Sequence, residues 1–285
     1  MNLQPINNVL IIGSQGFLGN RLVQHLNLHD EIQIFTDRTL VPGFDLHNSN
    51  HRERVLRLCT PQVVIQTAWC TRMNYLESPE NAHYAESTID FLDECSNFSV
   101  QHFVGFGTGL ETYIRVPQGH SRVSNLINSE YVKSKINTRN KIFEIAQDLG
   151  VRVDWVQIFQ LYGMGQHREK FFPYSIRTLM NHKPIQVEYP LILNDWVWID
   201  DVCNLVISLV QNRNDSAIHQ AGSGSSISNQ ELINQLARAI QSRSKIHFNE
   251  KNVEIFDYRA EVPHPLMTTS LSDGITLMIG ADAKA

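Results

Sequence analysis

The amino-acid sequence predicts an α/β fold, with a doubly wound parallel sheet and a smaller C-terminal lobe. Two observations predict it. First, the apolar run Val9–Ile12 leads into a turn with three glycines, and helical periodicity follows. Second, short apolar strands alternate with amphipathic helices along the first half of the chain. That alternation is typical of βαβ units with right-handed crossovers.

The turn from Gly13 to Gly19 has its glycines at G-x-x-G-x-x-G spacing. Glycine lets the backbone bend sharply, and it lets a diphosphate approach the unpaired N–H groups of the helix that starts near Phe17. The turn therefore predicts a dinucleotide-binding site. A tight strand-to-helix turn without a ligand is the alternative interpretation, because such a turn alone is a weak signal.

A second strand, Glu31–Arg38, carries the acid Asp37 at its end, 18 positions after Gly19. A carboxylate at about this spacing can bind the ribose hydroxyls of an adenine dinucleotide, and a solvated turn acid is the alternative. Arg38 could meet a 2′-phosphate, yet Asp37 would repel that phosphate. The pair therefore favours NAD and leaves NADP open.

Further strands and helices follow in the order that a parallel sheet requires. Thr108, a small polar residue, stands at the end of one strand, and Gly150 closes the longest helix as its C′ residue. The expected elements are a helix over 50–59, the strand Pro61–Ala68, the helix Pro79–Cys95, the strand His102–Thr108 and the helix Ser124–Leu149.

The longest helix contains Tyr131 and Lys135, four positions apart. Residues at i and i+4 lie on one helical face, so the phenol and the ammonium are neighbours. An ammonium beside a phenol favours the phenolate, which lets the tyrosine exchange a proton near neutral pH. For an isolated pair of this kind, a surface contact is the commoner explanation, and only the combination with the other motifs favours a catalytic one.

Composition excludes several classes of protein. The net charge of −5 over 285 residues gives no reason to expect a nucleic-acid partner. The four cysteines are far apart, which favours free thiols in a reducing compartment over disulfides or a zinc site. The histidines show no metal-ligand spacing, so no metal is expected. The sequence shows neither a signal-peptide pattern nor a membrane-spanning apolar run, and a cytoplasmic location is expected.

Together these motifs resemble the short-chain dehydrogenase/reductase superfamily. The later chain resembles its extended branch, the NAD-dependent epimerase/dehydratase family acting on nucleotide sugars. Gln160–Gln166 is similar to the family's LYGPGQ turn, Asp195–Val202 to its RDYVHVDDV segment, and Ala221–Leu232 to its GSG…SxxEL segment. The last of these also has the pattern of a strand end, a glycine turn and a capping box. The resemblance implies a Rossmann-type sheet.

The resemblance also implies roles for particular residues. Tyr131 would be the general acid/base, Lys135 would bind the nicotinamide ribose, and Thr108 would hydrogen-bond the reacting oxygen. Asp37 would hold the adenosine ribose, and Ala68 would line the nicotinamide side. Further cofactor-binding residues would be Gly13, Gln15, Gly16, Phe17, Leu18 and Gly19 around the pyrophosphate, Arg38, and Asp45 and Leu46 beside the adenine.

The segment from Thr108 to Tyr113 departs from the family pattern, because it is one residue longer or rearranged. Many dehydratases of the family carry an Asp–Glu pair directly after this threonine. This chain has Gly109 and Leu110 there, with a single Glu111 further on. The missing pair argues against an enzyme that eliminates water.

Two further positions differ from the family. Tyr84 stands where the family often has an asparagine, and Asn194 stands where an arginine often grips the substrate diphosphate. Arg259 is then the better candidate for binding that diphosphate. Arg177 is a weaker candidate, for which a solvated surface arginine is the alternative.

We therefore expect an NAD- or NADP-dependent oxidoreductase that acts on a nucleotide-activated sugar, with a keto-sugar reductase preferred. An epimerase of the same family is the close alternative, since it uses the same Tyr, Lys and Thr. A non-catalytic dinucleotide-binding regulator is another class. That class predicts the loss of Tyr131 or Lys135, and both are present.

The expected domain organisation has two parts. A dinucleotide-binding domain spans residues 1–160, with 195–222 returning to it, and a substrate-binding lobe comprises 161–194 and 223–285. A nucleotide-sugar substrate is the expected partner, without nucleic acid or membrane. A homodimer through the helices at about 79–95 and 124–149 is possible.

Overall fold

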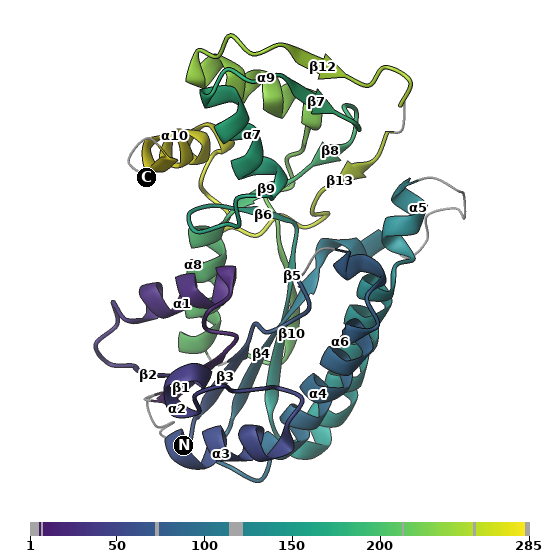
Figure 1. Ribbon diagram of the computed structural model, residues 1–285. Coiled ribbons are helices and arrows are strands. Elements are labelled where there is room, and N and C mark those ends of the chain that lie inside the picture. Colours follow the sequence, from purple (N-terminus) through teal and green to yellow (C-terminus); the bar gives the residue numbers. More distant parts are fainter. Residues whose placement is uncertain are drawn as a thin grey trace. The chain divides into compact units, whose positions relative to one another are not determined.

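The computed structural model divides into two compact units, Met1–Gln157 with Cys203–His219, and Ile158–Val202 with Gln220–Ala285. Each unit has its own sheets, helices and hydrophobic core, and each is described by itself (Figure 1). The structure describes residues 6, 8–71, 74–113, 122–212, 214–252 and 255–282.

A six-stranded sheet in the order β10-β5-β4-β3-β1-β2 forms the centre of the first unit. Strand β1 pairs in parallel with β2 and β3, and β3 pairs in parallel with β4. This order confirms the predicted doubly wound α/β sheet, because the chain runs from β1 outward to the edge strand β2 and then crosses back to β3, β4, β5 and β10 on the other side of β1. The strands are β1 (Asn8–Ile12), β2 (Gln33–Thr36), β3 (Val63–Gln66), β4 (His102–Thr108), β5 (Arg152–Ile158) and β10 (Ala217–Ala221).

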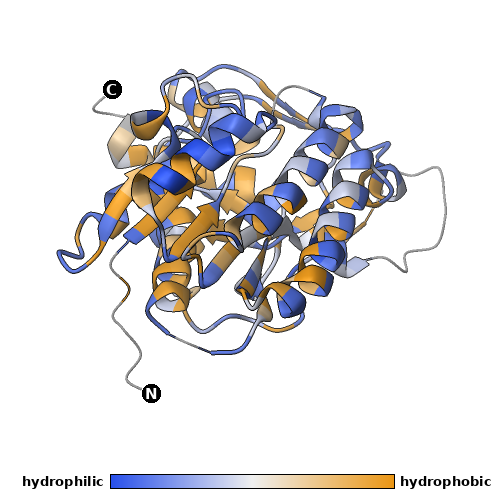
Figure 2. Cartoon of the chain, turned by 90° about the horizontal axis from the view of Figure 1, so that it is seen from below, coloured by the Kyte–Doolittle hydropathy of each residue, from blue (hydrophilic) through white to orange (hydrophobic). Residues whose placement is uncertain are grey.

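Helices cover the sheet because its inner strands β1, β3 and β4 are buried along almost their whole length. Strand β4 is buried along its whole length, and the strands are hydrophobic where the helices carry hydrophilic residues (Figure 2). Helices α4 and α6 pack side by side (Figure 1). The remaining elements are α1 (Phe17–Leu26), α2 (Asp37–Leu40), α3 (Ser49–Cys59), η1 (Tyr75–Glu77), α4 (Glu80–Cys95), η2 (Gly109–Tyr113), α5 (Arg122–Ile127), α6 (Glu130–Leu149) and α8 (Ile199–Gln211).

The second unit is built from small sheets around an aromatic core. Tyr162 stacks on Phe172 with ring centroids 4.4 Å apart, and Trp196 and Trp198 approach Tyr162 edge-on. Its elements are β6 (Gln160–Tyr162), α7 (Phe171–Met180), β7 (Ile185–Val187), β8 (Leu193–Asn194), β9 (Trp196–Trp198), β11 (Ile227–Ser228), α9 (Asn229–Ile240), β12 (Ile246–Phe248), β13 (Asp257–Tyr258) and α10 (Leu271–Asp282).

Local signals for helix ends are confirmed where they are strong. Gly150 follows α6 with φ of 66°, a left-handed conformation that glycine adopts without strain. Ser228 caps α9, and its side chain accepts a hydrogen bond from the Glu231 N–H, as the capping box requires.

The predicted single helix over Ser124–Leu149 is wrong, because the chain forms α5 and α6 with a break between them. Ser129 causes the break. It is extended, with ψ of 154°, and its Oγ accepts from the Val132 N–H while donating to the Leu126 carbonyl. A serine that caps the following helix competes with continuous helical periodicity, and here the cap wins.

None of the helices in the described residues is both long enough and apolar enough to cross a bilayer. No cluster of three or more His, Cys, Asp or Glu side chains within these residues is arranged to hold a metal ion.

Candidate functional site

The glycine turn of the first unit joins β1 to α1 in a shape that side chains would prevent. Gly13 has φ of +79°, and a Cβ there would lie 2.6 Å from the Ala68 backbone nitrogen. A Cβ on Gly19 would lie 2.2 Å from the Gly13 carbonyl oxygen. The turn therefore packs against the end of β3 and against the first turn of α1 with no room for larger residues.

Asp37 lies against this turn, although it follows a different strand. Its carboxylate accepts hydrogen bonds from the Gly13 N–H at 2.9 Å, from the Ser14 N–H at 3.4 Å and from the Ser14 hydroxyl at 2.5 Å. The side chain is 3% exposed, so Asp37 is not a solvated turn acid. The structure brings together the two sequence features from which a dinucleotide site was predicted, the glycines and the acid.

The other predicted cofactor residues of the first unit differ in exposure. Gln15, Gly16 and Arg38 are exposed, whereas Phe17 and Leu18 are half-buried at the start of α1. In a separate loop, Asp45 is exposed and accepts a hydrogen bond from the His47 N–H at 3.0 Å, and Leu46 is buried in the core. Ala68 is half-buried beside Gly13.

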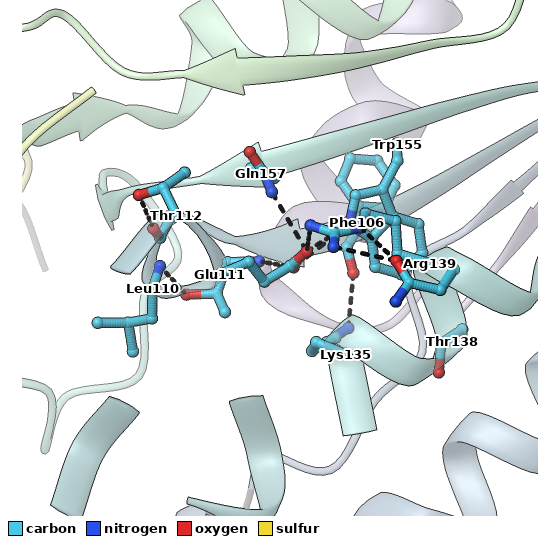
Figure 3. A network of polar contacts seen from close by, with 12 residues as sticks. Phe106, Leu110, Glu111, Thr112, Lys135, Thr138, Arg139, Trp155 and Gln157 are labelled. Atoms are coloured by element: carbon cyan, nitrogen blue, oxygen red, sulfur yellow. Dashed lines mark hydrogen bonds and ion pairs between the residues drawn. The ribbon is translucent and has the colours of Figure 1, made fainter. Parts of the chain in front are cut away.

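Lys135 is the most enclosed of the predicted catalytic residues. It is 5% exposed, and its Nζ donates to the Phe106 carbonyl oxygen of β4 at 2.7 Å (Figure 3). The Nζ also lies 3.4 Å from the centroid of the Trp69 ring and 5.9 Å from that of Tyr131. Burial lowers the pKa of Lys135 to about 7, against a smaller raising effect of the Glu111 charge.

Tyr131 lies on the same helix as Lys135, and Thr108 ends the strand to which Lys135 is hydrogen-bonded. Tyr131 is half-buried on α6, and its ring meets the Tyr75 ring edge-on at 5.0 Å between centroids. Thr108 ends β4, is 6% exposed, and its Oγ1 accepts from the Leu110 N–H at 3.4 Å. The hydrogen bond from Lys135 to the β4 backbone joins these two elements.

Sequence reasoning missed several residues that surround this group. Trp69 covers the ammonium, and the Glu111 carboxylate is buried in a network with Arg139, Trp155 and Gln157 (Figure 3). One local signal could have pointed to the network. Gly105 and Gly107 alternate on β4, and two glycines on one side of a buried strand indicate that other groups approach its backbone there.

The predicted substrate arginines belong to the second unit, and each is engaged within it. Arg177 of α7 donates to the Arg168 carbonyl oxygen at 2.8 Å and lies 3.5 Å from the Glu169 carboxylate. Arg259 follows β13, is 55% exposed, and its Nε lies 3.1 Å from Asp257.

Comparison with known structures identifies the fold. The chain matches UDP-glucose 4-epimerase from Thermus thermophilus, solved with NAD, with a TM-score of 0.79 at 18% identity, covering 98% of this chain and 99% of that one. It matches RMD from Pseudomonas aeruginosa, solved with NADPH, with a TM-score of 0.82 at 17% identity, covering 98% and 100%. For dTDP-glucose 4,6-dehydratase from Streptomyces venezuelae the TM-score is 0.77 at 18% identity, covering 97% of each chain. No curated protein sequence matches.

The family comparison extends across most of the chain. The model of the NAD dependent epimerase/dehydratase family matches residues 9–221, from the first strand of the sheet to the end of the last. The matched region includes the glycine turn, Asp37 and the Tyr131–Lys135 helix face. The chain therefore belongs to the NAD-dependent epimerase/dehydratase family.

Proposed function

We propose that the protein is an NAD(P)-dependent oxidoreductase acting on a nucleotide-activated sugar, and that it reduces a keto-sugar with Tyr131 as general acid. One observation carries this proposal. A buried ammonium, that of Lys135, lies one helical turn from Tyr131 and is bonded to the strand that ends in Thr108. A charged amine beside a phenol is the arrangement that proton transfer to a sugar oxygen requires.

The glycine turn fits a dinucleotide. Exposed Gly16 precedes α1 as its N-cap, so the N–H groups of the first helical turn are available to a diphosphate. The Asp37 carboxylate favours NAD, because it would repel the 2′-phosphate of NADP, and exposed Arg38 keeps NADP open. When bound, the nicotinamide ring donates or accepts the hydride.

The chain's own residues would handle the rest of the chemistry. Tyr131 would transfer a proton to or from the sugar hydroxyl, and Thr108 would hydrogen-bond the same oxygen. Lys135 would bind the nicotinamide ribose and favour the phenolate form of Tyr131 through its charge.

The environment of Glu111 supports the absence of a dehydratase reaction. Its carboxylate is 1% exposed and accepts from four separate donors, so it has no free face with which to move a substrate proton. Gly109 and Leu110 offer no acid or base. Reduction of a keto-sugar and epimerisation both remain chemically available, since each uses Tyr131, Lys135 and Thr108, and an epimerase is our second candidate.

The second unit is the proposed substrate lobe. Arg259 is our first candidate for the diphosphate of the nucleotide sugar, because it follows β13 with its side chain 55% exposed. Arg177 is the second candidate. The similar structures include a UDP-glucose 4-epimerase and a dTDP-glucose 4,6-dehydratase, which supports a nucleotide sugar as the substrate class without identifying the sugar.

The proposal is tested by turnover. A panel of nucleotide 4-keto sugars is supplied with NADH or NADPH, and nicotinamide absorbance is followed together with product analysis. Net oxidation of the nicotinamide cofactor indicates a reductase. An altered sugar without net oxidation of the cofactor indicates an epimerase. Tyr131→Phe should cut turnover by about 10²–10⁴-fold with cofactor binding largely intact. Unchanged turnover in that variant would refute the assigned role, and a protein that binds dinucleotide without turning over any sugar would be a regulator.

A further inference from the structure

The carboxylate of Glu111 is sealed inside the first unit and fully engaged. Oε1 accepts from the Thr108 N–H at 2.8 Å, and Oε2 accepts from Arg139 Nη1 at 2.9 Å and from Gln157 Nε2 at 3.2 Å (Figure 3). The indole N–H of Trp155 lies within 3.3 Å of both oxygens. These hydrogen bonds and the one ion pair compensate the cost of burying the Glu111 carboxylate as an anion.

Strand β4 is shaped to admit this anion. A Cβ on Gly107 would lie 2.0 Å from Glu111 Oε1 and 2.3 Å from Trp155 Nε1. A Cβ on Gly105 would lie 2.7 Å from the ring of Trp155. Two missing side chains on one strand thus leave the space that the carboxylate and the indole fill, which ties the strand's sequence to the network.

The same network connects the end of β4 to the helix of the catalytic pair. Arg139 lies four positions after Lys135 on α6, hence on the same helical face, and it pairs with Glu111 of η2. One turn earlier, Lys135 donates to the Phe106 carbonyl oxygen. Two charged groups of α6 are therefore fixed to neighbouring points, one on the strand and one on the helix that follows it.

We propose that Glu111 is a positioning residue: it holds the Thr108 backbone in place and, paired with Arg139, sets a negative charge beside the helix face that carries Lys135. This proposal rests on the proposed function for the catalytic role of Lys135. The contacts of Glu111 themselves involve no substrate. Glu111 acts through these neighbours and does not touch the reacting atoms.

The charges around Lys135 give this role a sign. Glu111 on η2 is the negative group that acts on the Lys135 ammonium, and Arg139, one turn after Lys135 on α6, is paired with Glu111. Burial lowers the pKa of Lys135 to about 7, and the charge of Glu111 acts in the opposite direction. Without Glu111 the amine would lose its proton at a lower pH, and without Arg139 it would keep it to a higher pH.

A titration that needs no substrate tests this. Trp69 contacts the ammonium of Lys135, so its fluorescence should follow the protonation of that amine. The pH midpoint is measured for the full-length protein, with Lys135→Met as the variant that should lack the transition. Glu111→Gln keeps an acceptor for the Thr108 N–H and removes the charge, and it should lower the midpoint. Arg139→Gln should raise it.

Opposite shifts in these two variants distinguish charge from loosened structure, since damage to packing would move both in one direction. An unchanged midpoint in Glu111→Gln, or a lowered one in Arg139→Gln, overturns the proposal. If Glu111→Gln does not fold, Arg139→Gln is the test. A pH midpoint that stays the same or falls in that variant then overturns the proposal.

Kinetics then connect the charge to catalysis. If the protein is a reductase or epimerase, the alkaline limb of its kcat profile should move in Glu111→Gln by the same shift as the fluorescence midpoint. Turnover should therefore fall at pH 7 and recover at lower pH. Turnover that is lost at every pH contradicts the positioning role of Glu111 even if the fluorescence shift is found. Failure of the proposed function would instead appear as unaltered turnover in Tyr131→Phe.

Discussion

The ammonium nitrogen of Lys135 lies 3.4 Å from the centroid of the Trp69 ring, so an aromatic face covers the cation that the proposed reaction needs. The indole N–H of Trp69 is held by the Asn81 side chain at 2.9 Å. A cation on a ring face gains about 0.5–2 kcal/mol, which partly offsets the cost of burying the charge. Ligand groups that reach this ammonium must change the surroundings of the ring.

Titration with NAD should therefore change the fluorescence of Trp69. We expect a saturable change in the wild-type protein that is reduced in Trp69→Phe, because the Lys135 ammonium lies 3.4 Å from the Trp69 ring centroid and 5.8 Å from that of Trp155. Binding itself is followed by calorimetry in both proteins. The same fluorescence change in Trp69→Phe and in the wild type would show that the nicotinamide end does not approach Lys135.

Stability should depend on pH through Lys135. Its pKa is about 7 in the folded protein and about 10.4 in an unfolded chain, so the unfolded state binds more protons between these values. The free energy of unfolding of the wild type, relative to Lys135→Met, should therefore rise with pH above 7, by up to about 1.4 kcal/mol per pH unit. Urea unfolding at pH 7, 8 and 9 measures the difference.

Lys133 on the same helix is the matched control. Its side chain is 60% exposed and pairs with Glu130, and this pairing raises its pKa. Both its folded and its unfolded states stay protonated from pH 7 to 9, so Lys133→Met should show a constant difference from the wild type. A slope for Lys133→Met equal to that for Lys135→Met would remove the explanation by burial.

Gly107→Ala should destabilise the first unit, because the new methyl group would meet Glu111 and Trp155 at 2.0 and 2.3 Å. Overpacking of this kind costs about 1–3 kcal/mol in free energy of unfolding. Gly280→Ala on α10 is the control, since nothing lies within 4 Å of its added Cβ and alanine favours a helix by about 0.5–1 kcal/mol. Thermal unfolding of both variants checks the contrast, and wild-type stability in Gly107→Ala contradicts the close packing.

Asp37→Ala should weaken both the turn and the cofactor site. The Gly13 N–H and the Ser14 hydroxyl would lose their acceptor. A buried donor without an acceptor costs about 1–3 kcal/mol in free energy of unfolding. Affinity for NAD should fall at least tenfold and the preference for NAD over NADP should narrow. Asp30→Ala, which removes an exposed acid just before β2, should change neither property. An undiminished NAD affinity in Asp37→Ala would separate Asp37 from cofactor binding.

The sequence predicted those features that local geometry determines. The G-x-x-G-x-x-G spacing marks a turn in which Gly13 needs a positive φ and Gly19 needs the absence of a Cβ, and both demands are visible in single residues. Alternating strands and helices predicted the doubly wound sheet, and the ordered motifs predicted the family. Each of these signals lies within about ten residues or repeats regularly along the chain.

Other features depend on contacts that a linear reading does not contain. The burial of Glu111 requires Arg139, 28 positions away, and Trp155, 44 positions away. Trp69 follows strand β3 and contacts Lys135 of α6, and nothing in the local sequence of either residue predicts this contact. The break before α6 was visible in Ser129 as a capping residue, but periodicity across the break was the stronger signal.

The bond between Asp37 and the Gly13 N–H has a consequence for how a dinucleotide meets this chain. The bend is fastened from within by the protein's own acid. The shape of the turn therefore does not depend on contacts with a dinucleotide. The proposed binding surface for the pyrophosphate would be formed by the chain alone.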